Sequence, residues 1–195
     1  TIQNKIKKKY NYSTQFDIFL NNINKNIIVS ITNNKYFEGC LTLIKSTEQY
    51  AYDVTIFYYD LDEILINILK NIKNVTVIDF NNIHSKKFDV EHTKGYFLKT
   101  KLLLYCYKNI KKNILYLDST INLKKNIDNI FEIINNEGFF CIDHSDRSSC
   151  VIINYNNFSS NFIEKYSVDH EILKKKQIKS GFFGFNNTKI SKKLS

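Results

Sequence analysis

The sequence predicts an α/β fold of three layers, with a mostly parallel central sheet and helices on both of its faces. Three observations predict this fold. Short runs rich in Ile, Val and Phe recur along the chain and end at turn-forming polar residues, as buried strands do. Segments between these runs carry apolar residues at helical spacing. Strands that alternate with helices in this way indicate parallel pairing, because crossover helices cover the sheet.

The expected elements follow in chain order. We expect strands at 27–31, 54–59, 75–79, 114–117, 139–143 and 182–185. Helices are expected from Tyr36, after Asp60, over about 96–108, and from about 127. Their predicted core faces are Phe37, Cys40, Leu41 and Ile44, then Ile64, Leu65, Ile68 and Leu69, and in the last helix Ile127, Ile130, Phe131 and Ile134. Asp60 with Glu63 resembles a capping box, Asn126 suits an N-cap, and Gly138 suits a helix end.

Length and composition indicate one folded domain. With 195 residues and 43% hydrophobic residues, the chain is long and apolar enough to bury a real core. We expect a polar lead-in at 1–26 and the domain at 27–195. No apolar run approaches the roughly 18 residues that cross a bilayer. The start at Thr1 and the absence of Met suggest a fragment, so targeting signals could be missing.

The cysteines favour a reducing compartment. The four are Cys40, Cys106, Cys141 and Cys150, and they form no CxxC pair. Three lie within apolar patterns, where a free thiol behaves as a small hydrophobic group. A cytoplasmic location is therefore expected, and a Golgi or ER lumen stays an alternative because we expect the N-terminus to be truncated.

The formal charge of +9 raises the question of whether the protein binds nucleic acid. The lysines are spread through an Asn- and Ile-rich sequence, and Arg147 is the single arginine, whereas base and phosphate recognition favours arginine. A nucleic-acid partner is not expected, although a basic nucleic-acid-binding domain stays an alternative. A basic surface would attract an anionic substrate.

One predicted strand ends at a carboxylate. Asp118 follows the run 114–117, at the edge where open α/β sheets bind ligands. A hard anionic ligand there suits Mg²⁺ or Mn²⁺, and with it a diphosphate. A strand-ending turn explains the same residue. The glycines form neither a GxGxxG nor a GxxxxGK pattern, so phosphates would need a metal or side-chain cations instead.

The order of these segments resembles the GT-A fold glycosyltransferases, whose sheet is Rossmann-like. The resemblance rests on Thr32-Asn33-Asn34 after the first strand, Gly95-Tyr96-Phe97-Leu98-Lys99, Ile114 to Asp118, and Ser180-Gly181-Phe182-Phe183-Gly184-Phe185-Asn186. It covers about residues 27–187. The strand at 114–118 is similar to the family's strand before the metal-binding DxD motif. Family domains continue past the equivalent of Phe185-Asn186, so we expect the C-terminal part of the acceptor side to be truncated.

The resemblance implies a role for each matching residue. Thr32, Asn33, Tyr36 and Asp79 would lie beside the nucleoside, Lys99 near the donor phosphates, and Ser180 and Gly181 near the donor sugar or acceptor. Lys101 would face away from the cleft if Lys99 faces it, because a step of two residues along a helix turns the side chain by about 200°. Asp118 matches the first carboxylate of DxD. The third position is Thr120 rather than Asp, so a metal held by Asp118 and Thr120 and a metal-independent enzyme are both compatible with the chain.

Two polar clusters are further candidates. Asp143-His144-Ser145-Asp146-Arg147 lies at the end of a predicted strand and could supply a metal ligand, a general base or a contact to the acceptor. Asp169, in Asp169-His170-Glu171, is a possible catalytic base if the enzyme inverts. Hydrated loops are the alternative explanation of both clusters, and simple exposure explains His84 and His92.

The predicted function is that of a hexosyltransferase-type glycosyltransferase. It would move a sugar from a nucleotide sugar, UDP-sugar favoured, to a hydroxyl of a glycan, protein or lipid, with Mn²⁺ or Mg²⁺ as the cofactor if one is used. Lys99, and a metal on Asp118 if one is used, would stabilise the diphosphate leaving group. An inactive GT-A-like domain that acts as a binding module is the main alternative, because of Thr120.

Overall fold

The computed structural model describes residues 25–82, 95–143 and 178–188. Its strands are β1 (Asn26–Thr32), β2 (Val54–Tyr58), β3 (Val75–Asp79), β4 (Asn113–Leu117), β5 (Phe139–Asp143) and β6 (Ile178–Phe185). Its α-helices are α3 (Phe37–Glu48), α4 (Glu63–Lys70), α5 (Gly95–Asn109) and α6 (Asp128–Glu137), with 3-10 turns η1 (Asn34–Tyr36) and η2 (Phe80–Asn82). Strands and helices therefore alternate as the sequence predicts, within one or two residues at most ends.

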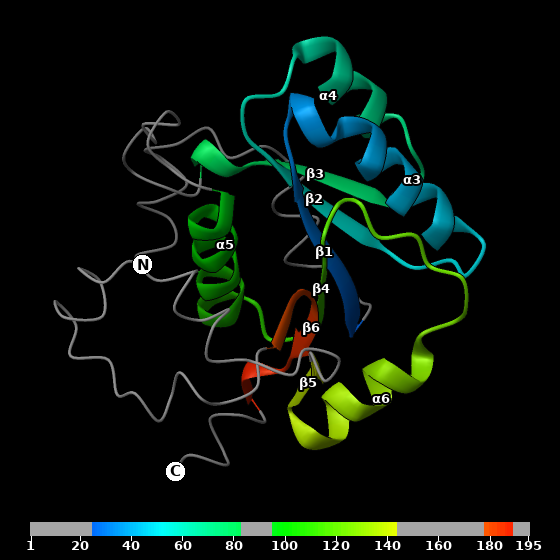
Figure 1. Cartoon of the computed structure of the whole chain (residues 1–195), viewed down its shortest axis with the longest axis vertical. Helices are drawn as coiled ribbons and strands as arrows, with labels where there is room; N and C mark the ends of the chain where they lie inside the picture. The colour runs from blue at the N-terminus through cyan, green and yellow to red at the C-terminus, as the bar shows by residue number, and fades with distance from the viewer. Residues whose placement is uncertain (1–24, 83–94, 144–177, 189–195) are drawn as a thin grey trace, which may run out of the picture. The chain divides into compact units, whose positions relative to one another are not determined.

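The strands form one mixed sheet in the order β3-β2-β1-β4-β6-β5 (Figure 1). β1 pairs in parallel with β2 and β4, and β2 pairs in parallel with β3. β6 runs antiparallel to β4, with Leu117 opposite Phe182. The prediction of a mostly parallel sheet is confirmed, and the carboxyl ends of β1 to β4 share one edge.

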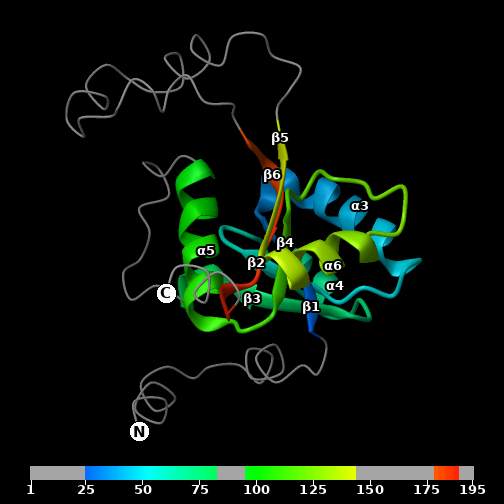
Figure 2. The same cartoon turned by 90° about the horizontal axis from the view of Figure 1, so that it is seen from below.

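Two apolar clusters, one on each face of the sheet, make the core. Alternate residues of β1 and β4 enter different clusters, because successive side chains of a strand point to opposite faces. The first cluster joins the sheet to α3, α4 and α6, and the second joins it to α5. Of the helices in the described residues, Figures 1 and 2 show α5 on one side of the sheet and α3, α4 and α6 on the other. The three-layer prediction is therefore confirmed.

Backbone contacts divide the chain into two units, residues 1–140 with 181–195, and residues 141–180. Of the second unit, the structure describes only 141–143 and 178–180. In the first unit, no helix among the described residues has the length and apolar character to cross a membrane. Cys40 and Cys106 are buried free thiols, and Cys141 is half-buried.

The predicted core face of α4 is wrong in part. Leu69 is fully buried and Leu65 packs against the core, but Ile64 is 74% exposed and Ile68 is 42% exposed. Leu65 and Leu69 are four residues apart and share one side of the helix, whereas Ile64 and Ile68 are rotated by about 100°. Ile64-Leu65 and Ile68-Leu69 are adjacent apolar pairs, so the sequence offers two apolar sides of the helix and does not show which of them packs on the sheet.

Both predicted helix starts differ in detail from the structure. Asp62 is the residue before α4, and its side chain makes no capping bond, while Asp60 has a positive φ of 48°. The capping box is therefore wrong. Ile127 precedes α6, although Asn126 still accepts a hydrogen bond from the N–H of Asp128 at 2.7 Å. Gly138 ends α6 as predicted, at a φ of 85° that suits glycine.

Candidate functional site

The alternation of β4 decides the direction of Asp118. Ile114 and Tyr116 belong to the cluster that packs on α5, and Leu115 and Leu117 to the opposite cluster. Asp118 comes two residues after Tyr116 and its carboxylate lies on the same side as that ring. The carboxylate therefore meets α5 at the carboxyl edge of the sheet.

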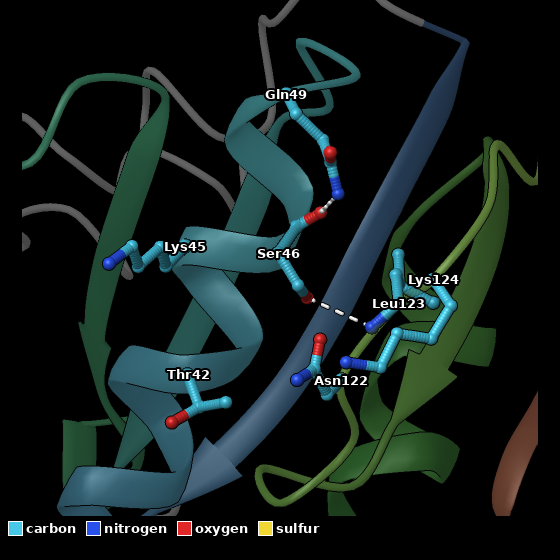
Figure 3. A pocket seen from close by; sticks show the side chains of 7 residues that line it. All are labelled: Thr42, Lys45, Ser46, Gln49, Asn122, Leu123 and Lys124. Atoms are coloured by element: carbon cyan, nitrogen blue, oxygen red, sulfur yellow. Dashed lines mark hydrogen bonds between the residues drawn. The ribbon is translucent and has the colours of Figure 1, made fainter.

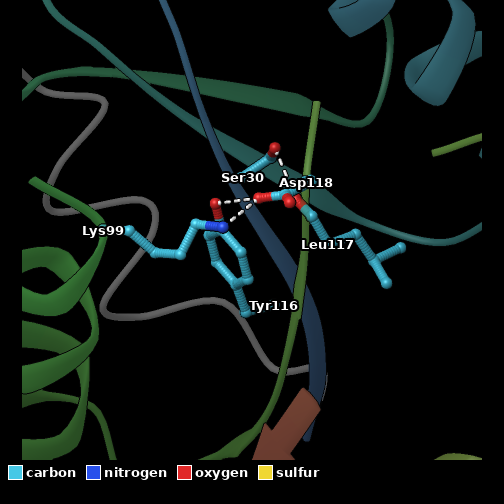
Figure 4. Close-up of polar contacts among 5 residues, drawn as sticks. All are labelled: Ser30, Lys99, Tyr116, Leu117 and Asp118. Carbon is cyan, nitrogen blue, oxygen red and sulfur yellow. Dashed lines mark hydrogen bonds and ion pairs between the residues drawn. The ribbon is translucent and has the colours of Figure 1, made fainter. Parts of the chain in front are cut away.

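Two side chains converge on one oxygen of Asp118 (Figure 4). Lys99 of α5 places its Nζ 2.6 Å from Oδ1, and the hydroxyl of Tyr116 donates to the same oxygen at 2.8 Å. Nζ of Lys99 also lies 5.2 Å from the centre of the Tyr116 ring. The Lys99 side chain is only 12% exposed, and that of Asp118 is 37% exposed. A lysine, a carboxylate and a phenol thus form one compact cluster.

Tyr116 is a member of this cluster that the sequence analysis missed. Burial raises the pKa of its hydroxyl far above the ordinary value, and the negative charge of Asp118 raises it further. The phenol therefore stays protonated and donates to the carboxylate. The signal available in the sequence was its position, since residues two apart on a strand share a face.

Backbone contacts fix the place where Asp118 leaves the strand. The N–H of Asp118 donates to the carbonyl of Gly181 at 2.8 Å, and its carbonyl accepts from the N–H of Ile121 at 2.9 Å. The buried hydroxyl of Ser30 donates to the carbonyl of Leu117 at 2.7 Å. A Cβ on Gly181 would lie 2.5 Å from Oδ2 of Asp118, so any other residue there would push the carboxylate out of its present position.

Three of the predicted nucleoside residues lie at the end of β1 and in the turn η1 that follows it. Thr32 is buried, and its side chain bonds the Cys40 thiol, whose pKa burial raises to about 12. Asn33 donates to the hydroxyl of Tyr59 at 3.1 Å and accepts from the N–H of Tyr36 at 3.3 Å. Tyr36 is 44% exposed, with Nζ of Lys35 5.4 Å from its ring centre. Asn33 and Tyr36 therefore lie at the surface, while Thr32 faces the interior.

Asp79 lies at the same edge of the sheet but further along it. It ends β3 opposite Tyr58, and its Oδ1 accepts from the N–H of Asn81 at 2.8 Å. The strand order separates β3 from β4 by three interstrand spacings, which is about 14 Å. One elongated ligand along the edge could therefore touch both Asp79 and the cluster around Asp118.

The described residues around Asp118 fit a divalent cation poorly. Oδ1 already faces the Lys99 ammonium, and Thr120 is exposed with its methyl group beside Gly39 of α3, the helix on the opposite face of the sheet from α5. Over residues 25–82, 95–143 and 178–188, no group of three His, Cys, Asp or Glu side chains could hold a metal. Mg²⁺ and Ca²⁺ prefer several oxygen ligands.

Several predicted candidates lie outside the described residues. These are Asp169 and its neighbours His170 and Glu171, residues 144–147, His84 and His92. Asp143 and Ser180 are described as strand residues of β5 and β6, without their side chains. Of the predicted site, the structure thus brings together Lys99, Asp118 and Gly181.

A separate cavity of about 630 Å³ lies between α3 and the segment after Asp118 (Figure 3). It is lined by Thr42, Lys45, Ser46, Gln49, Asn122, Leu123 and Lys124, none of which the sequence analysis assigned to the site. The buried Ser46 hydroxyl donates to the carbonyl of Leu43 and accepts from the N–H of Leu123. This serine therefore fastens the segment to α3.

Comparison with known proteins identifies the fold. No protein-family model and no curated protein matches the sequence. Among solved structures, the chain is similar to the bifunctional glycosyltransferase WbbM, with a TM-score of 0.56 and 14% identity over 88% of this chain and 33% of WbbM. It is also similar to the galactosyltransferase LgtC, solved with donor and acceptor sugar analogs, with a TM-score of 0.52 and 12% identity over 85% of this chain and 59% of LgtC.

This chain thus spans a third of WbbM and somewhat over half of LgtC. At this identity, the likeness concerns the fold. The sheet order and the helices on both faces agree with it. The chain has the GT-A fold of these glycosyltransferases.

Proposed function

We propose that this domain transfers a sugar from a nucleotide-diphosphate sugar to an acceptor hydroxyl. The observation that carries the proposal is the cluster of Lys99, Asp118 and Tyr116 at the carboxyl edge of β4. In open α/β sheets this edge is where ligands bind. The similarity of the fold to solved glycosyltransferases supports sugar transfer as the reaction.

The chemistry needs a cation beside the leaving group. The bond between the anomeric carbon and the diphosphate oxygen breaks, and its electron pair stays on the diphosphate. The acceptor oxygen bonds the anomeric carbon and loses its proton. The Lys99 ammonium, held against Asp118 at the sheet edge, would stabilise the growing negative charge. Preorganisation favours this role, because the side chain is already fixed before the donor arrives.

The rest of the donor would extend along the edge toward β3. Tyr36 offers an exposed ring on which a base can stack, and Asn33 and Asp79 offer polar groups to a base or ribose. Thr32 would contribute its backbone, because its side chain is buried. Gly181, and Ser180 before it, would lie beside the donor sugar or the acceptor. A UDP-sugar is the favoured donor.

The acceptor is proposed to be a hydroxyl of a glycan, protein or lipid, and transfer of a hexose is favoured. The LgtC structure with an acceptor sugar analog supports a sugar acceptor. Asp169 would serve as the base that takes the acceptor proton if the reaction inverts the anomeric centre. If the reaction retains it, no such base is required.

A melting-temperature screen with UDP-, GDP- and CMP-sugars, followed by a donor turnover assay, tests this function. We expect a UDP-sugar to raise Tm and to be hydrolysed or transferred, since a bound ligand stabilises the folded state. Lys99→Met should lose both effects. Lys108→Met is the matched control, because Lys108 is exposed on the same helix, nine residues and therefore half a rotation away. Failure of every donor to shift Tm would contradict the proposal.

A second candidate is a donor-binding domain without turnover. The exposed Thr120 favours it, because this residue stands where the family pattern has a second carboxylate. A UDP-sugar would then raise Tm without any release of UDP, even with glycan acceptors present. Measured UDP release that Lys99→Met removes would exclude this candidate.

A further inference from the structure

We propose that the Lys99 ammonium takes the place of a divalent cation at Asp118, so that the domain binds a nucleoside diphosphate without metal. This inference deepens the proposed function and rests on it. It assigns Lys99 as the phosphate-binding cation. It assigns Asp118 as a positioning residue that holds Lys99, rather than as a metal ligand.

The position of the ammonium carries the inference. Nζ lies 2.6 Å from Oδ1, and the Tyr116 hydroxyl lies 2.8 Å from the same oxygen. A Mg²⁺ ion bonded to this oxygen would stand about 2.0–2.1 Å from it, and would compete there with the ammonium and the phenol, which both already contact it. Two neighbouring cations would also repel each other. A metal could enter at Oδ1 only after Lys99 had moved away.

The surroundings of Lys99 keep it in place. Its side chain is 12% exposed, its Nζ lies 5.2 Å from the ring centre of Tyr116, and the ring itself is 1% exposed. A lysine so enclosed has lost most of its rotamer freedom on folding. The ordering cost is therefore met before ligand arrives, which favours binding of phosphate.

The other ligands that a metal would need are missing from the described residues. Thr120 brings a hydroxyl instead of a carboxylate, and its methyl group lies beside Gly39, away from α5. Over the three described ranges, no third acidic, His or Cys side chain joins Asp118 in a metal-binding group. One carboxylate is enough to hold a lysine, and it is a weak site for a metal.

The two roles of Asp118 predict opposite effects of removing its charge. A metal ligand changed to Asn loses the metal, and diphosphate binding is lost with it. A positioning residue changed to Asn keeps an oxygen that accepts from Lys99 and Tyr116. It also removes a negative charge that opposes the phosphates, so binding survives.

The test is calorimetric titration of the whole chain with UDP, and with GDP as a second probe, after EDTA treatment and again with added Mn²⁺. We expect the Kd to change by less than about twofold on adding Mn²⁺. Lys99→Met should weaken binding in EDTA by about tenfold or more, through loss of a charge-assisted bond. Asp118→Asn should weaken binding less than Lys99→Met does, and by the same factor with and without Mn²⁺, because it loosens the hold on Lys99 but removes no metal. Lys108→Met should match the parent.

Two results overturn the inference in distinguishable ways. Binding that requires Mn²⁺, and that Asp118→Asn abolishes, would make Asp118 a metal ligand and leave the proposed function standing. Absence of UDP and GDP binding in every condition would remove the proposed function and this inference with it. If Lys99→Met fails to fold by circular dichroism, the Mn²⁺ dependence of the parent and of Asp118→Asn decides.

Discussion

Asp118 is the residue on which most of the site contacts converge. Its side chain receives Lys99 and Tyr116, and its backbone bonds Gly181 and Ile121. With 37% of its surface exposed, the carboxylate is neither sealed in the core nor fully hydrated. Contacts of this kind orient a charge while leaving it within reach of a ligand.

Removal of the Tyr116 hydroxyl should lower the free energy of unfolding. Tyr116→Phe keeps the buried ring but deletes a donor to a charged oxygen, so we expect a loss of about 1.5–3 kcal/mol in the free energy of unfolding. Urea denaturation measures it. Tyr107→Phe, at a half-buried ring on α5, should cost less than about 0.5 kcal/mol. Equal losses in both variants would show that the bond to Asp118 contributes nothing.

At this scale the sequence predicted part of the site. The end of a buried run before Asp118 predicted the carboxylate at the sheet edge, and the resemblance to a family put Lys99 near the donor phosphates. The shared oxygen, the phenol donor and the close approach of Gly181 depend on the distances between α5, β4 and β6. Such distances are decided by packing, which periodicity does not contain.

At the scale of elements, the strands were the easiest to predict. Buried strands are short and apolar on both faces, so their residue types alone mark them. The face of a helix is harder to predict where apolar residues occur in adjacent pairs. In α4, Ile64 and Ile68 lie in solvent while Leu65 and Leu69 meet the core. The helix packs beside β3 at one side of the sheet, and only its narrow Leu65 and Leu69 side is covered there.

This asymmetry of α4 gives a direct test. Leu69→Ala should destabilise the fold by about 2–5 kcal/mol, since it opens a cavity under a fully buried side chain. Ile64→Ala, on the same helix, should change stability by less than about 0.5 kcal/mol because the side chain is 74% exposed. Urea denaturation of both variants measures the difference. Comparable losses would mean that Ile64 is covered in solution.

At the scale of the whole molecule, charge is the main property that the fold does not explain. The formal charge of +9 comes from lysines spread along the chain. Such a surface attracts anions at long range, and salt screens that attraction. The proposed donor carries a diphosphate, so its binding should share this sensitivity.

We therefore expect the affinity for UDP to fall by about threefold to tenfold between about 50 mM and about 500 mM NaCl. Uridine, which carries no phosphate, is the matched control, and its affinity should stay constant. Calorimetric titrations at several salt concentrations measure both. A flat response for UDP would show that surface charge plays no part in donor binding.

The absence of a side chain at Gly181 makes the site depend on the register between β4 and β6, which are far apart in the sequence. A slide of β6 by a single residue would set Ser180 or Phe182 against the Asp118 carboxylate, and either residue brings a Cβ that has no room there. The hydrogen bond between Asp118 and Gly181 spans more than sixty positions of the chain. A version of the protein cut short before β6 would consequently lack one wall around its acidic group, however well the parallel strands assembled.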